Sequence, residues 1–186
     1  MYLKDKKSTS QISEIISCSQ GKVNYWLKKY RIKKRTISDS IYLLKNPNGD
    51  PFKFRRPYNI QSGILFGLGL GLYWGEGDKR GNQGARLSNS DPKLIKSYIN
   101  FLVSILGIDK TKLKFSIQIP PDLSSEETLN FWINELNLNK NQFYKPYILK
   151  KRGNGSYKNK SKYGTIIVYF NNIKLKKLIC KLIDKL

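Results

Sequence analysis

The sequence predicts an α+β fold, in which a small all-helical module precedes a larger domain that packs helices against a sheet. Three observations lead to this prediction. Residues 1–45 read as short amphipathic helices, residues 46–61 are rich in turn formers, and the remainder mixes helical spacing with strict two-residue alternation. We therefore expect a helix-turn-helix module at residues 1–45, a linker at 46–61 and an α+β domain at 62–186.

Residues 8–31 have the spacing of a helix-turn-helix. Ser8 or Ser10 can cap a first helix, and Ser19 can cap a second helix over residues 20–30. The side chains spaced for burial in the two helices are Ile12, Ile15, Ile16, Val23, Trp26, Leu27 and Tyr30. The positions from which a recognition helix would contact DNA bases are Gln20, Lys22, Asn24, Tyr25 and Lys28. The alternative is an ordinary helical hairpin with a solvated basic face, since residues 1–7 leave little room for a preceding helix.

A basic run at residues 31–35 leads into a short helix expected at 38–44, and the linker follows. Arg55 and Arg56, near the end of this linker, are expected to contact phosphate. A solvated linker without a partner is the alternative interpretation.

The stretch at residues 67–77 begins as an apolar helix and closes on one carboxylate, Glu76. Gly67, Gly71 and Gly75 recur every four residues, so a helix places them on one face. Each glycine costs a helix about 1 kcal/mol relative to alanine, and close contact with another helix would explain three of them. Glu76 would lie beside the negative pole of the helix dipole, where a cation is needed to offset its charge.

A membrane-spanning helix and a buried structural helix are two other interpretations of this stretch. The apolar run at residues 64–74 is about half of the roughly 20 residues that span a bilayer, so we expect no membrane helix. A buried structural helix capped by Gly77 is possible on spacing alone, but it leaves Glu76 unexplained.

The rest of the chain alternates strand and helix signals. We expect a β-hairpin over residues 78–89, a helix from Asp91 to Gly107, a strand at 112–119, a helix beginning at Ser124, strands at 143–149 and 165–170, and a helix at 173–186. In the strand at 112–119, one face is apolar and the other carries Lys112, Lys114, Ser116 and Gln118.

Composition restricts the possible chemistry. Lys and Arg number 35 against 13 acidic residues, a formal charge of +22, and 12 Tyr, 8 Phe and 3 Trp are interleaved with them. This balance favours a nucleic-acid partner. The absence of histidine excludes a His general base, a Ser-His-Asp triad and His-containing nuclease or zinc sites. Two cysteines and a polar N-terminus favour a reduced, intracellular setting without a signal peptide.

Residues 69–77, read as GLGLYWGEG, resemble the signature of the LAGLIDADG homing endonuclease family, with Gly71 and Gly75 at the small packing positions and Glu76 at the acidic one. The resemblance covers residues 62–186. It implies a saddle-shaped antiparallel sheet on DNA, pairing of two such helices, and a catalytic metal held by the acid. Because the motif occurs once, it implies a homodimer with contacts through Gly67, Gly71 and Gly75.

The resemblance implies a site-specific DNA endonuclease that uses Mg²⁺ or another divalent cation, acts on double-stranded DNA and needs no small-molecule cofactor. It assigns catalysis to Glu76, Asn89 and Lys174 and metal binding to Glu76 and Gly75. The DNA contacts expected in this domain are Lys79, Arg80, Arg86, Ser88, Lys112, Lys114, Ser116, Gln118, Lys150 and Arg152. The alternatives are a non-cleaving DNA-binding regulator and an intron RNA maturase on the same fold.

Overall fold

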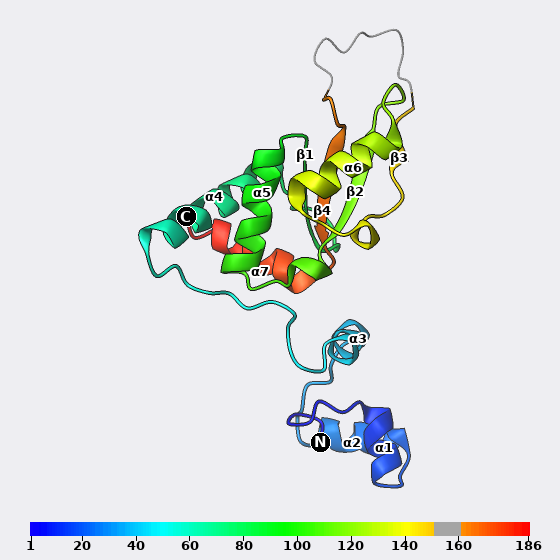
Figure 1. The fold of residues 1–186 in the computed structure, drawn as a ribbon. Helices are drawn as coiled ribbons and strands as arrows, with labels where there is room; N and C mark the ends of the chain where they lie inside the picture. The colour runs from blue at the N-terminus through cyan, green and yellow to red at the C-terminus, as the bar shows by residue number, and fades with distance from the viewer. Residues whose placement is uncertain (151–160) are drawn as a thin grey trace. The chain divides into compact units, whose positions relative to one another are not determined.

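A computed structural model describes residues 1–150 and 161–186 of the chain (Figure 1). They form two compact units, Met1–Pro51 and Phe52–Leu186. The boundary between the units falls within the stretch interpreted as a linker, because residues from Phe52 onward pack on the second unit.

The first unit contains the two helices of the predicted helix-turn-helix. Helix α1 is Thr9–Ile15 and helix α2 is Gln20–Lys29, and a third helix, α3, is Ile37–Lys45. The Ser8 hydroxyl accepts the backbone N–H of Gln11 in a reciprocal capping box, and the Ser19 hydroxyl accepts that of Lys22. These caps satisfy N–H groups that a helix leaves unpaired in its first turn.

The burial predicted for this pair is only partly correct. Ile12, Val23 and Leu27 are buried, but four of the expected core residues are exposed: Ile15, Ile16, Trp26 and Tyr30. Two short helices that pack mainly on each other bury one row of side chains each, so the flanking positions face water. Residues 1–7 form no helix; the Arg35 guanidinium holds them by donating to the carbonyls of Lys6 and Lys7.

The second unit has a four-stranded mixed sheet with helices packed against it. Its elements are α4 (Ile60–Glu76), β1 (Ala85–Asn89), α5 (Pro92–Asn100) continued by a π-helical turn (Phe101–Ile105), β2 (Lys114–Ile119), α6 (Ser125–Leu136), β3 (Tyr147–Ile148), β4 (Thr165–Phe170) and α7 (Ile173–Ile183), with 3₁₀ turns at Lys110–Lys112 and Lys140–Gln142. In the described part of the chain, no helix combines the length and apolarity required to cross a membrane.

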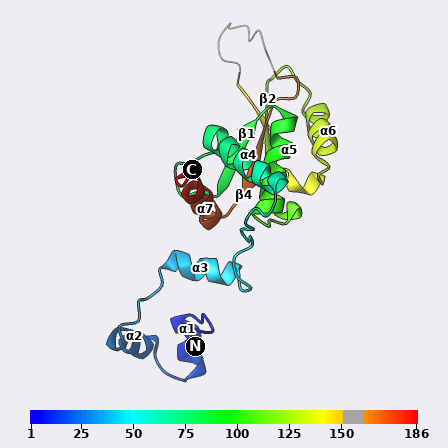
Figure 2. The same ribbon diagram turned by 90° about the vertical axis from the view of Figure 1, so that its left-hand side faces the viewer.

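The strand order is β1-β4-β2-β3, with β4 antiparallel to both β1 and β2 and β3 parallel to β2. Alternation along β2 and β4 places every second side chain in the core. Figures 1 and 2 show α5 and α6 on the same side of this sheet. The core between them includes Leu87, Ile95, Phe101, Phe115, Ile117, Trp132, Ile166 and Val168.

Three strand predictions need correction. The hairpin expected at residues 78–89 is reduced to one bridge between Gly77 and Leu87, because β1 pairs with β4 instead. The strand expected at 143–149 shortens to Tyr147–Ile148 and runs parallel to β2. Lys112 lies in a 3₁₀ turn that Asp109 caps, so β2 begins at Lys114.

The end of the predicted linker is part of the second unit. The backbone N–H groups of Lys53 and Arg55 donate to the carbonyls of Leu106 and Ile105, both at 2.8 Å. The alternate side chains, Phe52 and Phe54, pack against the core. Residues 52–55 therefore pair with the end of the π-helical turn and hold its carbonyl groups.

Candidate metal and nucleic-acid site

Helix α4 is divided into a buried face and an open face. Leu70 and Tyr73 are fully buried, and Gly69 lies against Phe101, where an added Cβ would come within 2.0 Å of the ring. Gly67, Gly71 and Gly75 lie elsewhere on the helix, and a Cβ on any of them would meet nothing within 4 Å. Within α4, the glycine that the packing requires is therefore Gly69, which the four-residue spacing does not reveal.

The open face of α4 is apolar along its length. Between its glycines it exposes Ile60, Ile64, Leu68 and Trp74 by 81%, 64%, 45% and 59%. Such a face costs free energy in water, because apolar surface stays hydrated. We call this surface, with Gly63, Gly67, Gly71 and Gly75, the glycine face.

Glu76 is the last residue of α4, and its side chain is exposed. In the described part of the chain, its carboxylate forms no hydrogen bond or ion pair. The Lys79 ammonium donates to the backbone carbonyl of Trp74, in the last turn of α4. Lys79 was expected to contact phosphate. This cation supplies positive charge at the helix end, where the dipole is negative.

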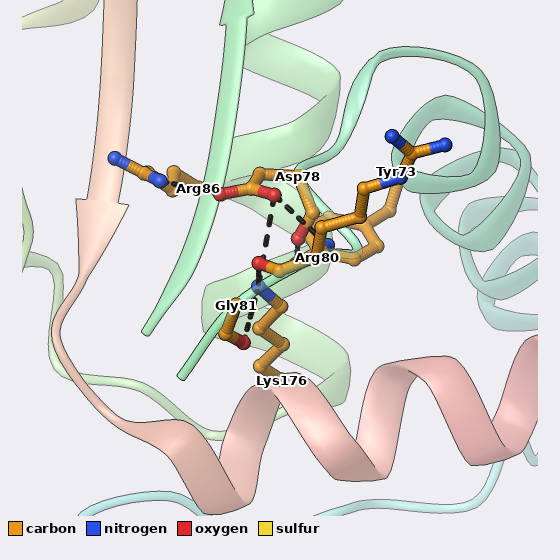
Figure 3. Close-up of polar contacts among 6 residues, drawn as sticks. All are labelled: Tyr73, Asp78, Arg80, Gly81, Arg86 and Lys176. Atoms are coloured by element: carbon orange, nitrogen blue, oxygen red, sulfur yellow. Dashed lines mark hydrogen bonds and ion pairs between the residues drawn. The ribbon is translucent and has the colours of Figure 1, made fainter. Parts of the chain in front are cut away.

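A partly buried ion-pair cluster fixes the loop that follows Glu76 (Figure 3). The Arg86 Nε donates to Asp78 Oδ2 at 2.8 Å, and the Lys176 Nζ lies 3.7 Å from Asp78 Oδ1. The Arg86 guanidinium holds the pKa of the Asp78 carboxyl below its usual value. The Tyr73 hydroxyl donates to the Asp78 carbonyl at 2.8 Å, and burial raises the pKa of this hydroxyl.

Lys176 is a buried lysine that the sequence analysis did not single out. Its side chain is only 3% exposed, and its ammonium donates to the carbonyls of Arg80 and Gly81. It lies in α7 beside Leu175, on the buried side of the helix, so a lysine at an apolar position was the available signal. Lys174 is exposed in the first turn of α7.

Asn89 has a local structural role at the end of β1. Its Oδ1 accepts the backbone N–H of Asp91 at 2.9 Å, and Asp91 in turn caps α5. The carboxamide oxygen is already engaged in the turn that leads into α5.

The other face of the sheet is polar, basic and half-buried, and strand register arranges its side chains in rows. Arg86, Tyr169 and Lys114 form one row across β1, β4 and β2. The next rows are Ser88, Ile167 and Ser116, then Thr165 and Gln118. One surface therefore carries Arg86, Ser88, Lys114, Ser116 and Gln118, and we call it the polar sheet face. Two of its cations are engaged: Arg86 with Asp78, and Lys114 with the Asn141 carbonyl at 3.0 Å.

The remaining predicted DNA contacts are dispersed. Gln20 donates to the Thr9 hydroxyl at 2.8 Å, and the Asn24 Oδ1 is buried with no hydrogen-bond partner among the described residues. The exposed members of the set are Lys22, Tyr25, Lys28, Arg55, Arg56, Lys79, Arg80, Lys112 and Lys150. Arg152 lies outside the described residues.

The described residues contain no group of three or more His, Cys, Asp or Glu side chains that could hold a metal ion. The oxygen donors at the end of α4 are the Glu76 carboxylate and backbone carbonyls such as that of Gly75. This donor set suits Mg²⁺, which takes one or two carboxylates. The chain brings one carboxylate, that of Glu76, to this end of the helix.

A search of protein-family models, curated proteins and solved structures finds no match to this chain.

Proposed function

We propose that this chain is a site-specific, divalent-metal-dependent endonuclease of double-stranded DNA, similar to the LAGLIDADG family, that acts as a homodimer. One observation carries the proposal. Glu76 is an exposed acid at the end of a helix on whose glycine face a Cβ added to Gly67, Gly71 or Gly75 would meet no described residue within 4 Å. The saddle shape of the sheet and the association with DNA are part of this proposal.

Pairing of α4 with its copy would explain the glycine face. Glycines at helical spacing let two backbones approach closely, and burying Ile60, Ile64, Leu68 and Trp74 would offset the free energy that the glycines cost each helix. A two-fold interface brings the same patch of both subunits together. Pairing along this face would therefore bring two Glu76 side chains to one end of the interface.

The two carboxylates would hold the metal, with the Gly75 carbonyl beside them. A bound divalent cation supplies activated water and relief of charge on the phosphate. Lys176 acts as a positioning residue in this scheme. Its ammonium fixes the carbonyls of Arg80 and Gly81, in the loop between Glu76 and β1. Lys174 and Asn89 remain proposed catalytic residues.

DNA would lie on the polar sheet face. Ser88, Ser116 and Gln118 can donate and accept hydrogen bonds, and Arg86 and Lys114 bring positive charge to the same surface. Arg86 would act there with Asp78 already bound to it, so its guanidinium is oriented before DNA arrives.

The test is cleavage of a randomised DNA library by the full chain, with Mg²⁺ or with a chelator. Glu76→Gln keeps the size and polarity of the side chain and removes its charge, so we expect loss of cleavage with DNA affinity retained within about twofold. Glu14→Gln, an exposed acid of the first unit, is the matched control and should cut normally. Normal cleavage by Glu76→Gln would remove Glu76 from the mechanism.

A non-cleaving DNA-binding regulator is the second candidate. The observation that favours it is the single carboxylate at the site, because Asp78, the next acid along the chain, is already paired with Arg86 and Lys176. In that case the wild-type chain would bind a selected DNA sequence tightly and leave it intact with every divalent cation tested.

A further inference from the structure

Three aromatic rings contact one another on the surface of the first unit. Tyr25, Trp26 and Tyr30 lie on α2 and at its C-terminal end, and they are 59%, 38% and 68% exposed. Trp26 and Tyr30 are stacked at 5.8 Å with 20° between their planes, and Tyr25 meets Trp26 edge-on at 5.5 Å. We call these three residues the aromatic platform.

The platform is surrounded by positive charge. The Lys29 ammonium lies 4.7 Å from the Trp26 ring centre, and Lys22, Lys28 and Arg31 are exposed on the same segment. No acidic residue occurs between Glu14 and Asp39. An uninterrupted basic segment around exposed rings is complementary to a polyanion that carries flat apolar groups.

The polar side chains expected to read a DNA groove from α2 are partly engaged within the unit. Gln20 donates to Thr9, and the Asn24 Oδ1 is buried. A recognition helix reads base edges through hydrogen-bonding groups, whereas α2 presents ring faces and ammonium groups. The surface of α2 therefore suits unpaired bases better than the base edges in the groove of a duplex.

We propose that the aromatic platform binds unpaired nucleotides by stacking their bases on its rings, with the surrounding lysines on the phosphates. Tyr30 is the most exposed of the three rings, and among the described residues Trp26 is the one ring that stacks on it. A nucleotide base can therefore stack on the face of Tyr30 that points away from Trp26. Stacking tolerates any base, so binding should show little sequence preference. The site is separate from Glu76 and does not depend on cleavage.

The experiment measures the affinity of the full chain for labelled single strands of thymidine or uridine nucleotides and for a duplex hairpin of equal length. Tyr30→Ala should weaken binding to the single strands about tenfold and change duplex binding less than twofold. Tyr30→Phe keeps the ring and should restore binding. Tyr58→Ala, which removes a tyrosine that is 89% exposed in the second unit, should have no effect. Comparing thymidine with uridine strands shows whether DNA or RNA is the preferred source of the bases.

Tryptophan emission provides a second readout. A bound single strand should quench the tryptophan emission of the wild-type chain. The quenching should be smaller in Trp26→Phe, because, of the two remaining tryptophans, Trp132 is fully buried and Trp74 lies on α4, in the second unit. Equal weakening of single strands and duplex by Tyr30→Ala would overturn the proposal in favour of a groove reader. Unchanged affinity of Tyr30→Ala for single strands would overturn it as well. So would a Tyr30→Ala variant that loses binding only to vesicles of anionic lipid and keeps its affinity for single strands.

Discussion

Two neighbouring glycines of α4 should respond oppositely to the same substitution. At Gly71 an added methyl group meets nothing within 4 Å, so Gly71→Ala should raise the free energy of unfolding by about 1 kcal/mol through helix propensity. At Gly69 the same methyl group would lie 2.0, 2.3 and 2.6 Å from three carbons of Phe101. Phe101 is fully buried and cannot swing into water.

Overpacking a core typically costs about 1–3 kcal/mol of stability. The short distances to Phe101 indicate a cost at the upper end of this range. After the helix-propensity gain, Gly69→Ala should lower the free energy of unfolding by about 2 kcal/mol. Urea unfolding followed by circular dichroism gives both values. Measurements at several protein concentrations separate the stability of the monomer from that of a dimer.

The same pair tests the glycine face. Gly71→Leu should remain folded but give a monomer by light scattering, since a large side chain keeps two helices apart. A tolerated Gly69→Ala would show that α4 does not pack on Phe101. A Gly71→Ala variant that is destabilised at every protein concentration would show that something within the chain covers this face.

Three further predictions concern the second unit. Because the pKa of the Asp78 carboxyl is lowered in the folded state, its ion pairs stabilise the fold above about pH 4 and lose their effect as the pH falls through the lowered value. Asp78→Asn should therefore lower the free energy of unfolding by about 1–2 kcal/mol near pH 7, a difference that thermal scans should show shrinking in acid. The second unit alone, as a truncated chain beginning at Phe52, should unfold cooperatively. A chain beginning at Ser62 should be several kcal/mol less stable, because it has lost two apolar side chains and two backbone hydrogen bonds; equal urea midpoints would contradict this. The Tyr98 hydroxyl is buried with no hydrogen-bond partner among the described residues, so Tyr98→Phe should raise the urea midpoint by the equivalent of about 1 kcal/mol, and a lower midpoint would reveal a hidden partner.

Local signals predicted most of the secondary structure. Ser8, Ser19, Asp91 and Ser124 cap helices where their position in the sequence suggests. Strict alternation located β2, because the pleat of a strand places every second side chain on one face regardless of its neighbours. These features depend on residues close in sequence, so they can be recognised without tertiary information.

Pairing between distant residues was less predictable. β1 lies in the second half of the stretch predicted as a hairpin, yet its partner is β4, some eighty residues later. The short β3 lies parallel to β2, an orientation that its own residues do not encode. Residues 52–55 look like part of a linker because they follow the turn-forming residues 46–51 and contain Lys53 and Arg55. In the structure, the carbonyls of Leu106 and Ile105 accept the backbone N–H groups of these two residues.

The sequence by itself determined the basic character of the chain, the exclusion of histidine chemistry, the apolar helix that ends in Glu76 and the alternating strand. Composition and local spacing are sufficient for these conclusions. Only the tertiary structure decided that Gly69 packs in the core while Gly67, Gly71 and Gly75 stay open, and that Asp78, Arg86 and Lys176 form one cluster. The reason is physical: a glycine or a charge has the same local signature wherever it lies, and its role depends on which distant side chains the fold brings to it.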